Sequence, residues 1–264
     1  MRRVVAITGA SAGIGRATAL RIARDGAAVA ICARRAAPLD AAADEIRRAG
    51  GEVLALTADV TRDTDMTSFV SRTVERFGRL DVMMCNAGFG IYGAIDQIEP
   101  ARMRQLVEVN FMGTYQAARA ALPVFRDQRG GQLIVVSSIV GKRGIPFMAA
   151  YAATKFAQVG LAESLRAELR GTGIHVTVVY PISTRTEFFD VMTKSSGFAT
   201  RAAGPQQDAD AVADAIARAI ERPAPEVYPL FKSRALVWLN AFAPGFCDRV
   251  VQRFGRKPLQ RERR

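Results

Sequence analysis

Short apolar runs alternate with longer amphipathic segments along almost the whole chain. The short runs lie at 4–8, 28–32, 53–56, 80–84, 133–137, 175–180 and, with a weaker pattern, 227–230. Helical periodicity fills the intervals at 14–24, 38–49, 66–77, 101–125, 151–170 and 209–221. Because the short runs are continuously apolar, we expect strands that are buried on both faces. The alternation predicts an α/β fold, a doubly wound parallel sheet of about seven strands with helices on both faces.

The same pattern predicts a single domain over residues 1–230 and an extension over 231–264. With 264 residues, of which 49% are hydrophobic, the chain can form one large core. Residues 183–207 have the weakest periodicity and are rich in Thr, Ser and Gly, as expected for a lid over a binding crevice.

A glycine-rich turn joins the first strand to the first helix. It contains Gly9, Gly13 and Gly15, with Ser11 and Ile14 between them. Glycine permits a tight turn and the close approach of a pyrophosphate, which then meets the unpaired N–H groups of the helix start. We therefore expect a dinucleotide at this turn; the alternative is a tight turn without a ligand.

A tyrosine and a lysine stand four residues apart at the start of the helix at 151–170. Tyr151 and Lys155 share one face of that helix, so an ammonium can lie beneath a phenol. Ser138 follows the buried strand at 133–137, at the same end of the sheet. The three side chains suggest proton-transfer chemistry. The alternative is a surface pair, because a tyrosine and a lysine at this spacing also arise by chance.

Further polar and small residues follow in chain order: Asp59 and Val60 after the third strand, Asn86, Ala87 and Gly88 after the fourth, and Asn110 within the long helix. Together with the glycine turn, Ser138 and the Tyr-x-x-x-Lys helix start, they resemble the short-chain dehydrogenase/reductase family. The resemblance is dense over residues 3–186 and weaker beyond them. It implies a Rossmann-type fold and an oxidoreductase that moves hydride between a nicotinamide and the carbonyl or alcohol carbon of a substrate.

The resemblance also implies four catalytic residues. Tyr151 would exchange a proton with the substrate oxygen, and Ser138 would orient that oxygen by a hydrogen bond. Lys155 would hold the nicotinamide ribose and lower the pKa of the phenol. One ammonium about 4 Å away would lower it by roughly 2 to 3 pH units from its usual ~10. Asn110 would hold a water that links Lys155 to solvent.

The turn after the second strand bears on the choice of cofactor. Ala33 stands where an acid would accept hydrogen bonds from the adenosine ribose, and Arg34 follows it. Since an arginine suits a 2′-phosphate, NADP(H) is favoured over NAD(H). The alternative is that Arg34 is only the solvated end of a turn.

The resemblance implies the remaining cofactor contacts. Ser11 would bind the same phosphate as Arg34, and Asp59, beside Val60, would accept from the adenine amino group. The segment Asn86, Ala87 and Gly88 would line the adenine ribose. After the sixth strand, Pro181, Thr184 and Thr186 would lie near the nicotinamide carboxamide. Ile182 replaces the glycine that the family usually has there.

The loops that should converge on this edge carry many apolar residues. The candidates for the substrate wall are Phe89, Ile91, Ile139, Val140, Ile145, Phe147, Phe188, Phe189 and Met192. With so little charge among them, we expect a small apolar carbonyl or alcohol substrate. The alternative is that about half of them pack under the lid.

The net charge of +12 is concentrated at the end of the chain. From residue 231 onward, nine basic and two acidic residues contribute +7 of that charge, around an apolar stripe that contains Trp238. We expect this extension to pack on a second subunit or on the body of the molecule. Peripheral contact with an anionic membrane is the alternative. Nucleic-acid binding has weak support, because no recognised module accompanies the arginines.

Other features bound the function. The cysteines Cys32, Cys85 and Cys247 are far apart, and His175 is the only histidine. We therefore expect a cytoplasmic protein without a metal site. The resemblance implies a homodimer or homotetramer. A competing hypothesis is a cofactor-bound sensor or binding protein with the same fold and little turnover.

Overall fold

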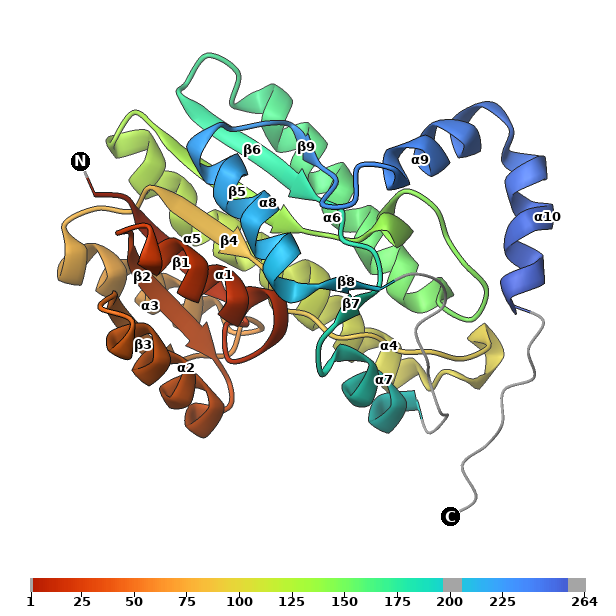
Figure 1. The fold of residues 1–264 in the computed structure, drawn as a ribbon, viewed down its shortest axis with the longest axis horizontal. Coiled ribbons are helices and arrows are strands. Elements are labelled where there is room, and N and C mark those ends of the chain that lie inside the picture. The colour runs from red at the N-terminus through yellow and green to blue at the C-terminus, as the bar shows by residue number, and fades with distance from the viewer. Residues whose placement is uncertain (1, 197–205, 256–264) are drawn as a thin grey trace.

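A seven-stranded parallel sheet forms the centre of the molecule (Figure 1). The computed structural model describes residues 2–196 and 206–255. The strand order is β3-β2-β1-β4-β5-β6-β9. The strands are β1 (Val4–Thr8), β2 (Ala28–Ala33), β3 (Glu52–Thr57), β4 (Val82–Cys85), β5 (Gly131–Val136), β6 (Ile174–Val179) and β9 (Glu226–Val227). The predicted α/β fold with a doubly wound parallel sheet is confirmed.

Two layers of helices bury the two faces of the sheet. The helices α1 (Gly13–Arg24), α2 (Ala36–Arg48) and α8 (Ala209–Glu221) pack on one face. The helices α3 (Asp63–Phe77), α5 (Gly113–Asp127) and α6 (Ala149–Glu168) pack on the other face. Because both faces are covered, every residue of β1 and β2 is buried, as their continuously apolar sequences predict.

The last strand is shorter than expected. The predicted last strand is present, but only Glu226 and Val227 pair with β6, so its expected bounds of 227–230 are wrong. Pro229 explains the early end, because a proline has no N–H to donate to the neighbouring strand.

The expected helix at 101–125 is divided into three parts. The helix α4 (Pro100–Val107) continues through a π-helical turn, η2 (Glu108–Met112), into α5. Such a turn shifts the backbone hydrogen bonds by one residue and frees carbonyl groups for other partners. Asn110 lies in the middle of it and is fully buried.

Several short elements have no counterpart in the sequence pattern. They are the 3₁₀ turns η1 (Ile95–Gln97) and η3 (Ile139–Gly141), the strands β7 (Thr184–Arg185) and β8 (Gln207–Asp208), and the helices α7 (Phe188–Ser196), α9 (Ser233–Phe242) and α10 (Pro244–Gly255). The expected lid at 183–207 thus contains β7 and α7, while its residues 197–205 lie outside the described residues.

The end of the described chain forms an arm of two helices, α9 and α10, that stands beside the body (Figure 1). Ser233 is the only buried residue of α9. No helix in the described part of the chain has the length and apolar character needed to cross a bilayer.

Replacing a buried and an exposed phenylalanine should show that the core contributes to the free energy of unfolding and that the arm does not. Phe125 is fully buried on α5, whereas Phe242 at the end of α9 is 89% exposed. Phe125→Ala should lower the free energy of unfolding by about 3–5 kcal/mol, because it leaves a cavity in the core. Phe242→Ala should change it by less than about 0.5 kcal/mol. Urea unfolding followed by circular dichroism measures both, and equal losses would contradict this placement of the core.

Candidate active site

The residues predicted to bind a cofactor gather at the carboxyl ends of the strands. The glycine turn follows β1, Arg34 follows β2, Asp59 follows β3 and Asn86 follows β4. Ser138 follows β5, and the segment from Pro181 to Thr186 follows β6. The strand order reverses between β1 and β4, and in such sheets ligands bind in the crevice outside this point.

The glycine turn requires glycine at two positions. Gly9 has φ +65°, and a Cβ there would lie 2.7 Å from the Cα of Ala87. At Gly15, a Cβ would lie 2.5 Å from Nδ2 of Asn86 and 2.6 Å from the carbonyl oxygen of Gly9. The end of β1 thus packs directly on the segment after β4, and a side chain at either glycine would push the two apart.

The start of α1 is suited to an anion. Ala12 occupies the N-cap position and provides no side-chain acceptor, and the first turn contains no acidic residue. The first N–H groups of the helix are therefore open to a ligand, and the helix dipole favours negative charge there. Thr186 lies close by, with its Cγ2 3.2 Å from the position of a Cβ on Gly13. These residues fit the pyrophosphate of a dinucleotide.

Two of the expected cofactor ligands also shape their own loops. The Asn86 amide Nδ2 donates to the carbonyl oxygens of Thr8 and Gly9, 3.0 Å away in each case. The Asp59 carboxylate accepts from the backbone N and the hydroxyl of Thr61, at 3.0 and 2.9 Å. Their contacts with adenosine stay predictions, but both side chains hold the strand ends around the crevice.

The two arginines after β2 have different surroundings. Arg35 forms an ion pair with Glu187, next to α7. Arg34 is exposed, and among the described residues it has no ion-pair partner. Arg34 is thus the arginine of this turn whose guanidinium is available to a ligand.

Tyr151 lies at the start of α6 beneath the apolar segment that follows β6. Its side chain is 7% exposed, and the centre of its ring lies 5.5 Å from that of Phe188 on α7. Burial raises the pKa of the phenol, while hydrogen bonding with the Ser138 side chain acts in the opposite direction. The phenol is therefore neutral near pH 7, in the form that can donate a proton.

Lys155 is buried one turn further along α6. Its Nζ donates to the carbonyl oxygen of Val136 and to Oε1 of Gln158, both at 2.9 Å. The Nζ lies 5.6 Å from the centre of the Tyr151 ring. Burial lowers the pKa of Lys155 to about 7. The expected net depression of the phenol pKa is wrong for this structure, because the loss of solvent on burial outweighs the groups that favour the phenolate.

Asn110 connects the segment after β4 to α6. Its side chain accepts from the backbone N of Phe89 and donates to the carbonyl of the same residue, and it also donates to the hydroxyl of Thr154. Its own carbonyl accepts from Gln158 Nε2 at 2.7 Å and from the hydroxyl of Thr114 at 2.8 Å. Two protein side chains thus donate to this carbonyl, and the water expected at Asn110 stays a prediction.

Sequence reasoning missed three polar residues of this network: Thr114, Thr154 and Gln158. Gln158 gave a signal, because it is a polar residue one turn after Lys155 beside the apolar Val159 and Ala162. The hydroxyls of Thr114 and Thr154 resemble those of any helical threonine in the sequence, and only the packing of α6 against this segment brings Thr154 to Asn110.

The expected substrate wall assembles around Tyr151. Eight of the nine candidates pack in one apolar cluster with it: Phe89, Ile91, Ile139, Val140, Ile145, Phe188, Phe189 and Met192. The ninth, Phe147, packs against Tyr92 of the same cluster, with ring centres 5.8 Å apart. Met192 is 1% exposed, and Gly90 leaves room for it: a Cβ there would lie 2.2 Å from its Cε.

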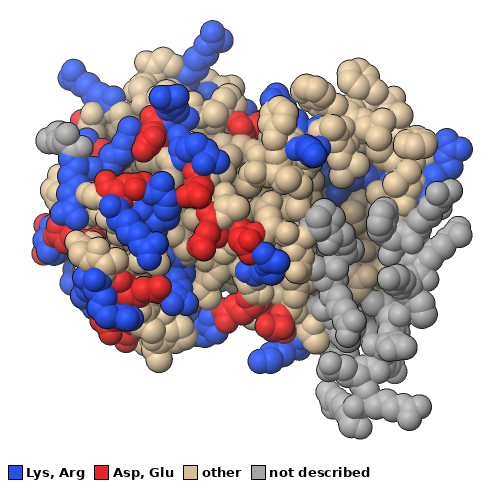
Figure 2. All heavy atoms as spheres, in the orientation of Figure 1, with Lys and Arg blue, Asp and Glu red and all other residues tan. Residues whose placement is uncertain are grey.

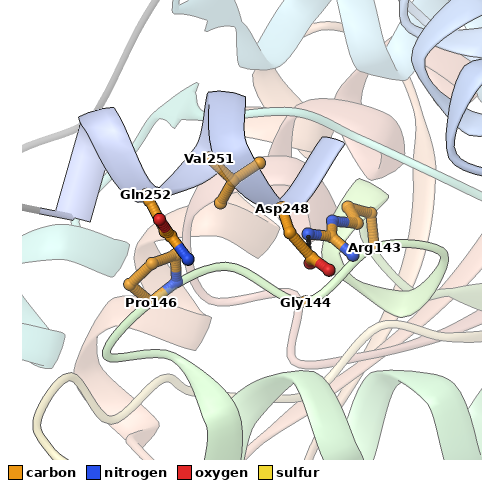
Figure 3. Close-up of a pocket in the computed structure, with 6 residues that line it drawn as sticks. All are labelled: Arg143, Gly144, Pro146, Asp248, Val251 and Gln252. Atoms are coloured by element: carbon orange, nitrogen blue, oxygen red, sulfur yellow. Dashed lines mark hydrogen bonds and ion pairs between the residues drawn. The ribbon is translucent and has the colours of Figure 1, made fainter. Parts of the chain in front are cut away.

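A separate hollow of about 270 Å³ lies between the loop before α6 and α10 (Figure 3). Arg143 forms an ion pair with Asp248 across it, at 2.5 Å. Its other lining residues are Gly144, Pro146, Val251 and Gln252. None of the expected site residues lines this hollow. The ion pair across it attaches α10 to the body. Among the described residues, no group of three or more His, Cys, Asp or Glu side chains could hold a metal ion.

Known proteins share both the sequence and the fold. A family model described as short chain dehydrogenase matches residues 3–196. An uncharacterized oxidoreductase of Listeria monocytogenes is 35% identical over 72% of this chain and 78% of its own length. A 3-dehydrosphinganine reductase of Arabidopsis thaliana is 38% identical over 71% of this chain and 57% of its own length.

Two solved structures resemble the whole domain. An actinorhodin polyketide ketoreductase with NADPH has a TM-score of 0.80 and 27% identity, covering 86% of this chain and 95% of its own. A 3-ketoacyl-(acyl-carrier-protein) reductase from Brucella melitensis complexed with NADH has a TM-score of 0.77 and 28% identity, covering 86% and 96%. The match over more than half of the chain shows that this protein belongs to the short-chain dehydrogenase family of nicotinamide-dependent oxidoreductases.

Proposed function

We propose that this protein is an NADP(H)-dependent oxidoreductase that acts on the carbonyl or alcohol group of an apolar substrate, with Tyr151 as the proton donor or acceptor. The observation that carries the proposal is the position of Tyr151. Its side chain is buried in an apolar cluster at the end of the central sheet, with the Nζ of Lys155 5.6 Å from the centre of its ring. Similar proteins named for the reduction of keto compounds support this reaction class.

Each residue has a chemical task in reduction. A nicotinamide, when bound, would supply hydride to the carbonyl carbon. The Ser138 hydroxyl would donate a hydrogen bond to the substrate oxygen, and the neutral Tyr151 phenol would transfer its proton to the same oxygen. Lys155, with a pKa lowered to about 7, can be charged or neutral at physiological pH. Its ammonium would stabilise the phenolate that forms after proton transfer.

The wall around Tyr151 supports an apolar substrate. The cluster is composed of aliphatic and aromatic side chains, and Phe188 and Met192 of α7 contact it from above. Since α7 covers the phenol, a substrate would reach it only after this helix moves. A sensor protein with the same fold would need no such arrangement, which disfavours that alternative.

Replacing Tyr151 tests the assigned chemistry. Tyr151→Phe should lower kcat by about 10²- to 10⁴-fold, because it removes the proton donor without altering the ring. Binding of NADPH, followed by its fluorescence, should be unchanged. The assay follows NADPH oxidation with a panel of apolar ketones and aldehydes.

The matched control is Tyr115→Phe, which removes the hydroxyl of an exposed tyrosine on α5 and should leave turnover unchanged. Undiminished turnover in Tyr151→Phe would overturn the role of this phenol.

The unpaired Arg34 supports a preference for NADP(H). Arg34→Ala should reduce the ratio of kcat/KM for NADPH to that for NADH by about 10- to 100-fold, since hydrogen bonds to charged groups contribute about 1.5–3 kcal/mol. Arg35→Ala is the control, because the Arg35 guanidinium is already paired with Glu187. Equal ratios in wild type and Arg34→Ala would show that this turn does not bind the 2′-phosphate.

The long helices offer a surface for a homodimer or homotetramer. Tyr115 on α5 and Phe156 on α6 are large apolar residues that are 42% and 46% exposed. Family members assemble through these helices, as the resemblance implies. We therefore assign a second copy of the chain to the α5 and α6 surface.

The arm formed by α9 and α10 carries a different apolar surface. Phe231, Leu236, Trp238, Leu239, Phe242 and Phe246 are all large and exposed. The side chains of α9 are not buried on the body, so the expectation of intramolecular packing is wrong for this helix. In Figure 2 the upper right of the molecule, where α9 lies, is mostly tan with blue residues at its border.

The positive charge of this arm favours an anionic partner. Lys232, Arg234 and Arg249 accompany the apolar residues, and the one acid of the described arm, Asp248, is paired with Arg143. A second copy would bring the same positive charge, so two arms would repel each other. An anionic bilayer would accept both the apolar side chains and the charge. Peripheral binding to an anionic membrane is therefore our proposal for the arm.

Vesicle flotation tests the membrane contact. The full chain should float with vesicles of phosphatidylglycerol and phosphatidylcholine, more weakly at high salt, and not with phosphatidylcholine alone. The double variant Trp238→Ser, Phe242→Ser should lose this binding. The control Ile95→Ser changes an exposed apolar residue outside both the arm and the α5 and α6 surface, and it should float normally. A full chain that does not float, or an arm variant that alters only the oligomer size, would contradict the proposal.

A further inference from the structure

Gln158 is a buried polar residue on the face of α6 that carries Lys155. It is 1% exposed and lies one helical turn after the lysine. Its neighbours on the buried face, Val159 and Ala162, belong to the apolar core. Burying an uncharged polar side chain in such a place lowers the stability of the fold unless each of its polar atoms has a hydrogen-bond partner.

All hydrogen-bonding groups of the Gln158 amide are engaged. Its Nε2 donates to the carbonyl oxygen of Asn110 and to the hydroxyl of Thr114, both at 2.7 Å. Its Oε1 accepts from the Nζ of Lys155 at 2.9 Å. The amide therefore bridges Lys155 to the π-helical turn. The two donor contacts fix the orientation of the amide, so that its oxygen faces the lysine.

This arrangement determines where the lysine points. An ammonium has three N–H donors, and the carbonyl of Val136 and the oxygen of Gln158 take two of them. One donor is left for the phenol or the ribose of a bound cofactor. Removing either acceptor would let the flexible lysine side chain turn away from that direction.

The Oε1 of Gln158 matters for the charge of Lys155, because the other groups around the lysine are uncharged. Tyr151 faces the lysine from α6 and the Val136 carbonyl from β5, while the position of a Cβ on Gly88 lies 3.8 Å from the lysine Nζ and 3.1 Å from Oδ1 of Asn110. Thr114 reaches the lysine only through Gln158. Cys85, whose thiol contacts the Thr114 carbonyl, lies behind them, and burial raises its pKa to about 12. These groups are uncharged near pH 7. Carbonyl oxygens, and no carboxylate, are thus the partners of the ammonium in the hydrogen bonds that the structure shows.

We propose that Gln158 is a positioning residue that holds the Lys155 amino group toward the site and favours its charged form by bridging it to the Asn110 carbonyl. The proposal rests on the function proposed for Tyr151 and Lys155. It differs from a structural role in one respect: a glutamine that only filled the contact between α6 and η2 would affect stability and leave the titration of Lys155 unchanged.

Two substitutions at Gln158 should move the pKa of Lys155 in opposite directions. Gln158→Met keeps the length of the side chain and removes the acceptor, so the charged form loses a partner and the pKa should fall from about 7 by about one pH unit. Gln158→Glu places a carboxylate against the Nζ, so the pKa should rise by one pH unit or more.

The titration is measured by ¹³C NMR of lysine-labelled protein without added cofactor. The chain contains five lysines, so the spectrum is simple, and Lys155→Met identifies the resonance. In the wild type, Lys155 should lose its proton as the pH rises through about 7, because burial disfavours the charge. The pH profile of kcat is the second readout, and its limb for Lys155 should move with the NMR midpoint in each variant.

Gln132→Met is the matched control. Gln132 is 2% exposed, and its Nε2 donates to the hydroxyl of Thr177 and the carbonyl of Ala219, at the opposite end of β5 from Ser138. This variant also loses two donors of a buried amide and should be destabilised. It should leave the titration of Lys155 and the pH profile as in the wild type.

The outcomes separate this proposal from the function on which it rests. A Lys155 midpoint that is the same in the wild type and both Gln158 variants, or that moves in one direction in both, would overturn the bridge. If Gln158→Glu does not fold, a midpoint unchanged in Gln158→Met is sufficient to overturn it. A Lys155 midpoint that falls in Gln158→Met and rises in Gln158→Glu supports the bridge, independently of any activity measurement. Turnover retained in Tyr151→Phe would instead overturn the catalytic function, whatever the titration shows.

Discussion

Burial of the Lys155 amino group without a carboxylate partner is the constraint on which the candidate site depends. The α6 helix brings this group into the interior, where Val136 and Gln158 provide neutral oxygens for it. Neutral partners compensate a charge less than a carboxylate would, so burial moves the pKa of Lys155 to about 7. The geometry that places these oxygens is therefore part of the chemistry, because it decides how much of the lysine is charged.

The π-helical turn and the strand ends provide that geometry together. The turn exposes the carbonyl of Asn110 to Gln158, while the side chain of Asn110 is held on the backbone of Phe89. On the other side of the crevice, Asn86 and Thr8 fasten the segment after β4 to the end of β1. The sheet edge between these anchors has glycines at close backbone contacts and an uncapped helix start, which fit the pyrophosphate of a dinucleotide.

Apolar surface is distributed unequally around this framework. The residues that line the site are covered by α7, whose Phe188 and Met192 pack on Tyr151 and Gly90. The residues of α9 have no such cover, since Trp238 is 57% exposed and Phe242 89%. A helix with apolar side chains in water needs a partner.

The amino-acid sequence determined the sheet, its order of elements, the family and the edge on which the site lies. Continuous apolar strands and the spacing of Gly9, Gly13, Gly15, Tyr151 and Lys155 are local properties, so the sequence alone can reveal them. The division of the helix at 101–125, the cover of Tyr151 by α7 and the partners of Lys155 were decided by the tertiary structure. These depend on contacts between residues far apart in the chain, such as Asn110 with Gln158, 48 positions later. A pKa set by burial is likewise a property of the packed molecule, because no residue type by itself specifies how much solvent it will lose.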